Sequence, residues 1–124
     1  MIDINDSNYN NLVIEKENEY FIIFFTSKTC PHCETVKKYL NIIDNDINKP
    51  ENLTIYKCQA EKSQKLLNLY NIRSFPTTFF FNKNKKIDSY IIGAEPIENF
   101  VKNIKKLNKK SIFEKIFKKW KLYH

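Results

Sequence analysis

Glycine is almost absent from this chain, which has only Gly93 among its 124 residues. Tight turns often need a positive φ angle, and after glycine the residue that adopts it most readily is asparagine. We therefore expect the abundant asparagines to form most of the turns. The accompanying excess of Asn, Lys and Ile is typical of a protein encoded by an AT-rich genome and carries no information about function.

Long apolar runs are also missing. The opening segment, MIDINDSNYNNLV, has neither the basic start nor the apolar stretch of a signal peptide. No later segment reaches the roughly 20 apolar residues of a membrane-spanning helix. We expect a protein of a non-secreted, reducing compartment such as the cytoplasm, where a stable structural disulfide is not expected.

Charge is distributed unevenly along the chain. Residues 1–101 carry 12 Lys and Arg against 13 Asp and Glu, whereas residues 102–124 carry nine Lys against one Glu. The body is therefore nearly neutral and the C-terminal part is strongly basic. Attraction to an acidic partner is expected of that part alone.

The apolar pattern predicts alternating strands and helices. Strands are expected at residues 2–4, 20–25, 53–58, 75–81 and 87–92, with YFIIFF (20–25) buried on both faces. Helices are expected at a short segment capped by Asp6 or Ser7 and ending near Val13, from residue 31 to Ile47, along a long stripe of Leu66, Leu67, Leu69 and Tyr70, and from residue 96. This order predicts an α/β fold with a mixed central sheet of four to five strands flanked by helices.

Two of the three cysteines, Cys30 and Cys33, lie in TSKTCPHCETVKK, between the buried strand and the first long helix. Unpaired N–H groups and the helix dipole stabilise a thiolate at a helix N-terminus, so Cys30 is expected to be a nucleophile. Pro31 suits the first helical position, and His32 adds a cation when protonated. Cys33, one turn further on, can attack a mixed disulfide on Cys30 and release the product.

A zinc site and a static disulfide are the alternatives to a redox pair. Zinc needs four ligands, and outside the pair the chain has only Cys58, His32 and His124. A static disulfide closing so short a loop restrains the unfolded chain little. The strand–helix context favours the redox pair. Cys58, inside a strand, is expected to be a small apolar core residue.

Four stretches carry a resemblance to a known family: FFTSKTCPHC, LTIYKCQAE, YNIRSFPTTFFFNKNKK and YIIGAEPIENFVKNI. On these, residues 1–109 resemble the thioredoxin and protein disulfide isomerase families. The resemblance implies a thioredoxin fold and a cis peptide bond before Pro76. It also implies that the substrate chain lies against Thr29, Pro31, Phe75 and Pro76, and that Lys57 assists proton transfer.

The chain departs from this family at two positions. Thr29 stands where the family has Trp, and Phe24 stands where it buries a carboxylate that relays the proton of the second cysteine. We expect slower deprotonation of Cys33 unless water or His32 substitutes. The CPHC sequence also resembles that of bacterial periplasmic oxidants, and SKTCPHCETVKK resembles the glutaredoxin active site, although the glutathione-binding signature of glutaredoxins is missing.

Residues 110–124 are expected to form a basic amphipathic helix outside the domain of residues 1–109. An apolar stripe in this extension consists of Ile112, Phe113, Ile116, Phe117 and Trp120. It lies roughly 150° around the helix axis from the preceding stripe, so one straight helix cannot bury both. Either the chain breaks near Ser111 and folds back, or residues 111–123 contact a membrane surface or a partner protein. Nucleic-acid binding is not expected.

From the residues and the resemblance together we expect a monomeric thiol–disulfide oxidoreductase that acts on protein substrates. Cys30 attacks, Cys33 resolves, His32 tunes the reduction potential, and an unidentified electron donor or acceptor completes the cycle. No cofactor or metal is expected, because the cysteine pair carries the electrons. The alternative is a non-catalytic adaptor with a vestigial CPHC stretch, for which the departures at Phe24 and Thr29 argue.

Overall fold

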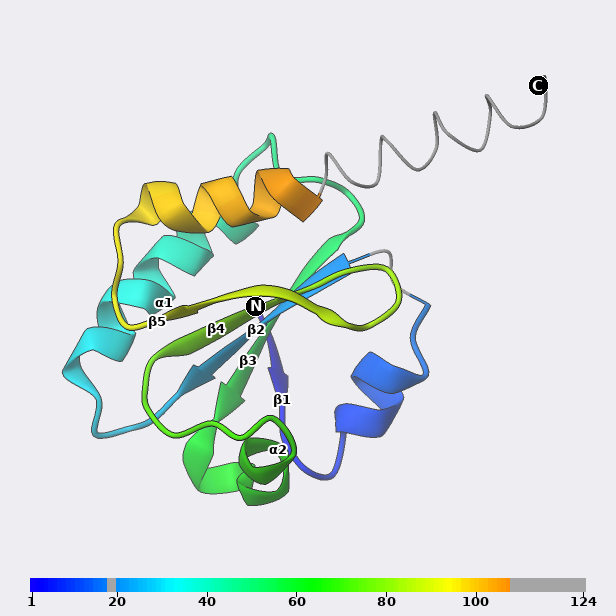
Figure 1. Cartoon of the computed structure of the whole chain (residues 1–124), viewed down its shortest axis with the longest axis vertical. Coiled ribbons are helices and arrows are strands. Elements are labelled where there is room, and N and C mark those ends of the chain that lie inside the picture. The colour runs from blue at the N-terminus through cyan, green and yellow to red at the C-terminus, as the bar shows by residue number, and fades with distance from the viewer. Residues whose placement is uncertain (18–19, 108–124) are drawn as a thin grey trace.

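The computed structural model describes residues 1–17 and 20–107 (Figure 1). Five strands alternate with helices, and residues 97–107 form a further helix. The elements are β1 (Ile2–Ile4), η1 (Asn10–Ile14), β2 (Tyr20–Thr26), α1 (Pro31–Asp44), β3 (Leu53–Gln59), η2 (Ala60–Lys62), α2 (Gln64–Leu69), β4 (Thr77–Phe81) and β5 (Ile87–Ile92).

The strands form one mixed sheet in the order β1-β3-β2-β4-β5. β1 and β2 both run parallel to β3, whereas β4 runs antiparallel to β2 and to β5. In Figure 1, α1 and the helix at residues 97–107 cover one face of the sheet, and α2 and η1 lie on the other. The predicted α/β fold, in which helices flank a mixed central sheet, is confirmed.

β2 is the centre of the sheet because it can be buried on both faces. Residues 20–25 are all buried, as the apolar run YFIIFF predicts. Alternate side chains enter two separate cores, since successive residues of a strand point to opposite faces. The core beneath α1, which we call the α1-side core, contains Tyr20, Ile22, Phe24, Cys33, Val36, Leu40, Ile43, Leu53, Ile55, Phe80, Ile91, Phe100, Ile104 and Leu107.

The opposite core, which we call the α2-side core, is built largely on aromatic rings. Phe21 stacks on Phe81 with ring centroids 4.4 Å apart, and Tyr70 meets Phe79 edge to face at 5.9 Å. Such arrangements add about 0.5–1.5 kcal/mol per pair beyond the area that they bury. Cys58 belongs to this core and is fully buried, as the sequence predicts.

Three local predictions are wrong in detail. Asp6 does not cap the helix that follows it. Its carboxylate instead accepts hydrogen bonds from the backbone N–H groups of Lys65 and Leu66, each at 3.0 Å, at the start of α2. α2 itself is a short helix of six residues rather than a long one. α1 ends at Asp44, so Ile47 lies beyond the helix and is 96% exposed.

Turns use asparagine in two ways. Asn71 adopts a φ of 54°, in the left-handed region that disfavours most side chains. Asn82 instead accepts hydrogen bonds from the backbone N–H groups of Asn84 and Lys86, which closes the turn between β4 and β5. Gly93, at a φ of 89°, donates its N–H to the carbonyl of Pro76 at 2.8 Å. The single glycine therefore occupies a position that combines a positive φ with a backbone hydrogen bond to Pro76.

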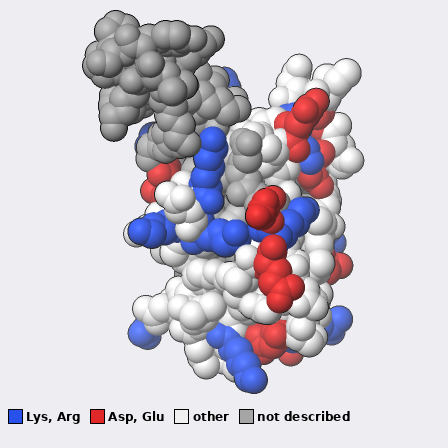
Figure 2. Space-filling model, turned by 90° about the vertical axis from the view of Figure 1, so that its right-hand side faces the viewer, with Lys and Arg blue, Asp and Glu red and all other residues white. Residues whose placement is uncertain are grey.

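Acidic and basic side chains are interspersed on the face of the body that Figure 2 presents. This agrees with the near-neutral charge of residues 1–101. No helix within residues 1–17 and 20–107 has the length and hydropathy needed to cross a membrane. The predicted amphipathic helix at residues 110–124 lies outside the described residues.

Candidate functional site

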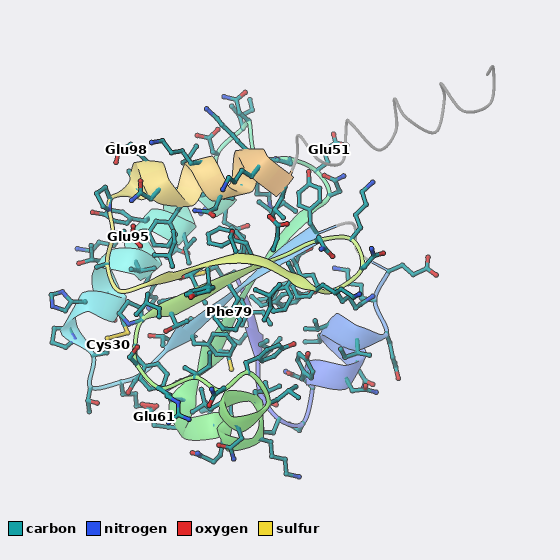
Figure 3. All side chains as sticks on the ribbon, in the orientation of Figure 1. Cys30, Glu51, Glu61, Phe79, Glu95 and Glu98 are labelled. Carbon is teal, nitrogen blue, oxygen red and sulfur yellow. A yellow bond between two sulfur atoms is a disulfide. The ribbon has the colours of Figure 1, made fainter. Side chains whose placement is uncertain are left out.

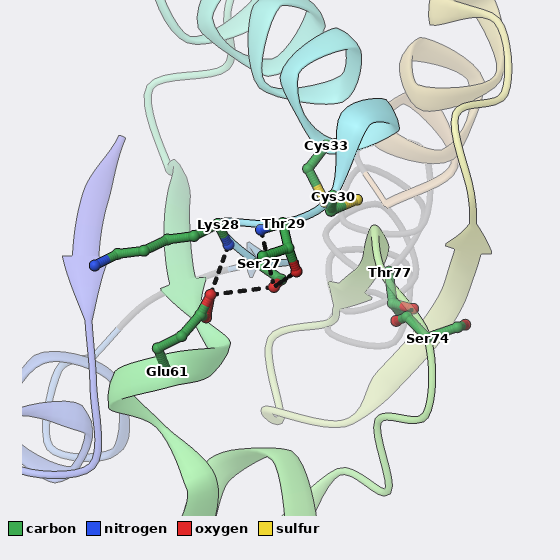
Figure 4. Close-up of a disulfide and its surroundings, with 8 residues drawn as sticks. All are labelled: Ser27, Lys28, Thr29, Cys30, Cys33, Glu61, Ser74 and Thr77. Atoms are coloured by element: carbon green, nitrogen blue, oxygen red, sulfur yellow. Dashed lines mark hydrogen bonds between the residues drawn. A yellow bond between two sulfur atoms is a disulfide. The ribbon is translucent and has the colours of Figure 1, made fainter.

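Cys30 and Cys33 form a disulfide at the start of α1, with their Cα atoms 5.3 Å apart (Figure 4). Cys30 is the N-cap residue, with an extended backbone at φ −108° and ψ 106°, and Pro31 follows at the first helical position. The N–H of Cys33 donates to the carbonyl of Cys30 at 3.3 Å. The first turn of the helix thus holds the two cysteines close enough to form the disulfide.

The two sulfur-bearing residues differ in exposure. Cys33 is 2% exposed and belongs to the α1-side core, whereas Cys30 is half-buried and packs against the edge of that core. Thr29, Pro31 and His32 are exposed around Cys30. Cys30 is therefore the more accessible of the two cysteines to an incoming molecule.

A carboxylate that the sequence did not single out braces the loop before Cys30. Glu61, in η2, accepts hydrogen bonds from the backbone N–H of Lys28 at 2.6 Å and from the hydroxyl of Ser27 at 3.1 Å. The bond from Lys28 is the largest cause that lowers the pKa of the Glu61 carboxyl. Figure 3 shows Cys30 and Glu61 at one end of the sheet and Glu51 at the other.

The loop before β4 lies on the other side of the disulfide. The peptide bond between Phe75 and Pro76 is cis, as predicted. Pro76 is buried, and Phe75 is half-buried against the α1-side core, on which Cys30 also packs. Thr77 anchors the loop by donating its hydroxyl to the carbonyl of Ser74 at 2.8 Å. In Figure 4 this loop and Glu61 flank the disulfide from opposite sides.

Lys57, for which a part in proton transfer is predicted, forms an ion pair in this structure. Its Nζ lies 3.2 Å from the Asp3 carboxylate on the edge strand β1, and the side chain is 26% exposed. On the other side of β3, Phe24 is its register partner and is fully buried in the α1-side core. Lys57 is thus in register with Phe24, but its charge is paired toward the edge of the sheet.

Two further features lie away from the disulfide. An apolar groove of about 430 Å³ runs between α1 and the helix at residues 97–107, lined by Ile42, Ile97 and Val101 among others. The third cysteine, Cys58, is buried on the opposite face of the sheet, and burial raises the pKa of its thiol to about 11. Within the described ranges 1–17 and 20–107, no three His, Cys, Asp or Glu side chains gather as metal ligands.

Comparison with known proteins relates most of the chain to one family. The family model described as Thioredoxin matches residues 1–106. The chloroplastic M-type thioredoxin of Spinacia oleracea is 30% identical over 105 residues, which cover 84% of this chain and 55% of that protein. Protein disulfide isomerase-like 2-2 of Oryza sativa subsp. japonica is 23% identical over 104 residues, covering 84% of this chain and 28% of that protein.

Solved structures agree with this at the level of the fold. The thioredoxin of Malassezia sympodialis superposes with a TM-score of 0.72 at 16% identity, covering 86% of this chain and 90% of that one. The reduced thioredoxin of Schistosoma mansoni gives a TM-score of 0.70 at 20% identity, covering 86% and 96% of the respective chains. The chain spans little more than half the length of the M-type thioredoxins of Spinacia oleracea and Pisum sativum.

Proposed function

The chain belongs to the thioredoxin family, and on this premise we propose that it is a thiol–disulfide oxidoreductase that exchanges disulfides with protein substrates through Cys30 and Cys33. The observation that carries the proposal is the unequal exposure of the pair at the N-terminus of α1. One sulfur is open to a partner and the other is held behind it. A static disulfide has no need of this asymmetry.

In the reducing direction, the Cys30 thiolate attacks a substrate disulfide. One substrate sulfur leaves as a thiolate, and a mixed disulfide forms between Cys30 and the other. Cys33 then attacks the Cys30 sulfur, the bond to the substrate breaks, and the Cys30–Cys33 disulfide remains. Two electrons pass to the substrate, and the two protons of the thiols go to the substrate sulfurs through solvent. The oxidising direction runs the same steps in reverse.

The surroundings of Cys30 suit an extended polypeptide. Thr29 and Pro31 flank Cys30 in the chain and are exposed, and the loop before β4 lies across the disulfide from Glu61 (Figure 4). The half-buried ring of Phe75 offers apolar surface to an unfolded substrate. His32, exposed beside Cys30, adds positive charge when protonated and so favours the thiolate.

Turbidimetric reduction of insulin tests the proposal. The wild type is expected to be active, Cys30→Ser to be inactive, and Cys33→Ser to accumulate a mixed disulfide visible by mass spectrometry. Cys58→Ala is the matched control, because it removes the thiol on the other face of the sheet. Full activity of Cys30→Ser, or none in the wild type, would favour the non-catalytic adaptor.

The direction of the reaction is tested separately, by the reduction potential of the pair against glutathione. A value near −270 mV, about that of thioredoxin, would indicate a reductase. A value between about −180 and −120 mV would indicate an isomerase or an oxidase. His32→Tyr is expected to lower the potential, because it removes a cation that stabilises the reduced thiolate.

A further inference from the structure

Because Cys33 is buried, its thiol needs a group that accepts its proton in the resolving step. Its side chain is 2% exposed and lies in an apolar core with Phe24 and Phe80. In the resolving step the sulfur must lose its proton while the substrate, bound to Cys30, covers the side from which solvent approaches. A proton acceptor within hydrogen-bond reach, or one water away, is needed for an efficient step.

Thr78 is placed on the same face of the sheet as Cys33. In β4 it pairs with Phe24 of β2 and Ile91 of β5, and both of these partners belong to the α1-side core. Directly opposed residues of antiparallel strands project from the same face. Thr77, one residue earlier, pairs with Phe25 of the α2-side core and therefore projects to the other face.

The Thr78 hydroxyl is fully buried and has no hydrogen-bond partner within the protein. An unsatisfied buried hydroxyl destabilises the folded state, and a valine of the same shape would avoid this cost. Tyrosines aside, the buried polar side chains among the described residues are Ser63, Thr77 and Thr78. Ser63 lies beside Cys58 on the other face, and Thr77 is bonded to Ser74.

The other candidates for handling the proton are engaged or remote. The Lys57 ammonium is paired with Asp3 at the sheet edge, and His32 projects into solvent. Phe24, between Lys57 and Thr78 in the register, has no polar atom to offer. Among the buried polar side chains of the described residues, tyrosines aside, Thr78 is therefore the one that lies on the Cys33 face of the sheet and has no hydrogen-bond partner.

We propose that Thr78 is a positioning residue for the resolving step: its hydroxyl holds a water molecule that takes the proton of the Cys33 thiol. A hydroxyl can donate and accept at once, so it can orient such a water without changing its own charge. The Cys33–Cys30 bond forms, the bond from Cys30 to the substrate breaks, and the proton passes through the water to the departing substrate thiolate or to solvent. Thr78 ends the step unchanged.

The inference rests on the proposed function, but its test does not depend on a protein substrate. The reduced protein is mixed in a stopped-flow instrument with excess 5,5′-dithiobis(2-nitrobenzoate). One thionitrobenzoate is released when Cys30 attacks, and a second when Cys33 resolves the adduct. Insulin reduction decides the proposed function, and the second release decides the role of Thr78, so the two can fail independently.

Thr78→Val is expected to leave the first release unchanged and to slow the second at least about tenfold at pH 7. In this variant the second rate should rise about tenfold per pH unit, since hydroxide must replace the positioned water. Thr78→Ser keeps the hydroxyl and should restore the rate. Ser63→Ala, the control, removes a buried hydroxyl beside Cys58 on the other face of the sheet and should leave the second release unchanged.

Thr78→Val should fold about as stably as the wild type in thermal denaturation, because valine fills the same space without leaving a buried hydroxyl. A slower second release in a stable variant therefore reports chemistry and not unfolding. A second release in Thr78→Val that matches the wild type in rate and pH profile would overturn the inference. So would an equal loss in Thr78→Ser, which would indicate packing of the methyl group instead.

Discussion

Glu61 and Lys28 are joined by a 2.6 Å hydrogen bond from the backbone N–H of Lys28 to the Glu61 carboxylate. The same carboxylate accepts from Ser27. η2, which follows β3, thus fixes the loop that leads from β2 to Cys30. A backbone N–H and a side chain from residues 33 positions apart in the sequence are thus joined in the loop that precedes Cys30.

Removing this carboxylate is expected to loosen the loop. In Glu61→Ala the amide of Lys28 should exchange with solvent faster, and insulin reduction should fall a few-fold because Cys30 is held less firmly. Hydrogen exchange and the insulin assay measure the two effects. Glu51→Ala, at the other end of the sheet, is the control and should change neither.

The same bond should respond to pH. Because the folded-state pKa of Glu61 is lowered, chiefly by the Lys28 N–H, its contribution is present above the ordinary carboxyl pKa of about 4.3. It is lost as pH falls through the folded-state value. Protection of the Lys28 amide should therefore decline in acid in the wild type and stay low at every pH in Glu61→Ala. Parallel pH profiles would contradict this.

Asp6 is expected to stabilise α2 from a distance. Its carboxylate accepts from the N–H groups of Lys65 and Leu66, two donors that have no partner within the helix. Asp6→Ala should lower the free energy of unfolding by about 1 kcal/mol, the usual effect of losing a helix cap. Urea denaturation measures it, with Glu51→Ala as the control. A change equal to the control would show that the cap contributes nothing.

Cys58 is expected to be inert in the folded protein. Its thiol is buried and its pKa is raised to about 11 by that burial. At pH 8 only about one thiol in a thousand would be ionised, and the thiolate is the reactive form. After reduction, brief treatment with iodoacetamide should label Cys30 but leave Cys58 unmodified, and guanidinium should expose it. Rapid native labelling at Cys58, read by peptide mass spectrometry, would contradict the prediction.

The raised pKa of the Cys58 thiol also implies that the protein becomes less stable in alkali. The folded state keeps the Cys58 proton up to a higher pH than the unfolded state does, so the unfolded state binds fewer protons above about pH 8.5. The stability supplied by this difference in proton binding is lost as pH rises above that value. Cys58→Ala should show a smaller decline between pH 8 and 11 in urea denaturation. Identical pH profiles would be evidence against it.

The basic segment at residues 111–123, outside the described residues, remains a predicted contact with a membrane surface or a partner protein. If it binds a membrane, the full chain should float with anionic phosphatidylserine vesicles, less so in high salt, and a chain lacking residues 110–124 should not. Insulin reduction by the shortened chain should be unaffected. Failure of the full chain to float would favour a helix folded back on the domain.

The sequence predicted well what depends on near neighbours. YFIIFF is buried because its own composition demands burial on both faces. CPHC begins a helix because Cys30 and Pro31 suit its first positions, and the resemblance placed the cis bond at Pro76. The alternation of strands and helices predicted the α/β fold with its mixed central sheet, but not the order of the strands within it. These features are local in the chain, or belong to a pattern that recurs throughout a family.

What the sequence did not reveal depends on which distant groups meet. The carboxylates of Asp6 and Glu61 look like ordinary surface charges in the sequence, yet each accepts backbone N–H groups from a segment far along the chain. The Thr78 hydroxyl is unsatisfied only because the register sets it between Phe24 and Ile91. The sequence alone singled out Cys30 and Cys33 as the candidate redox pair. Tertiary packing decided which one is exposed and what lies behind the other, because burial and hydrogen-bond partners arise only when the layers close.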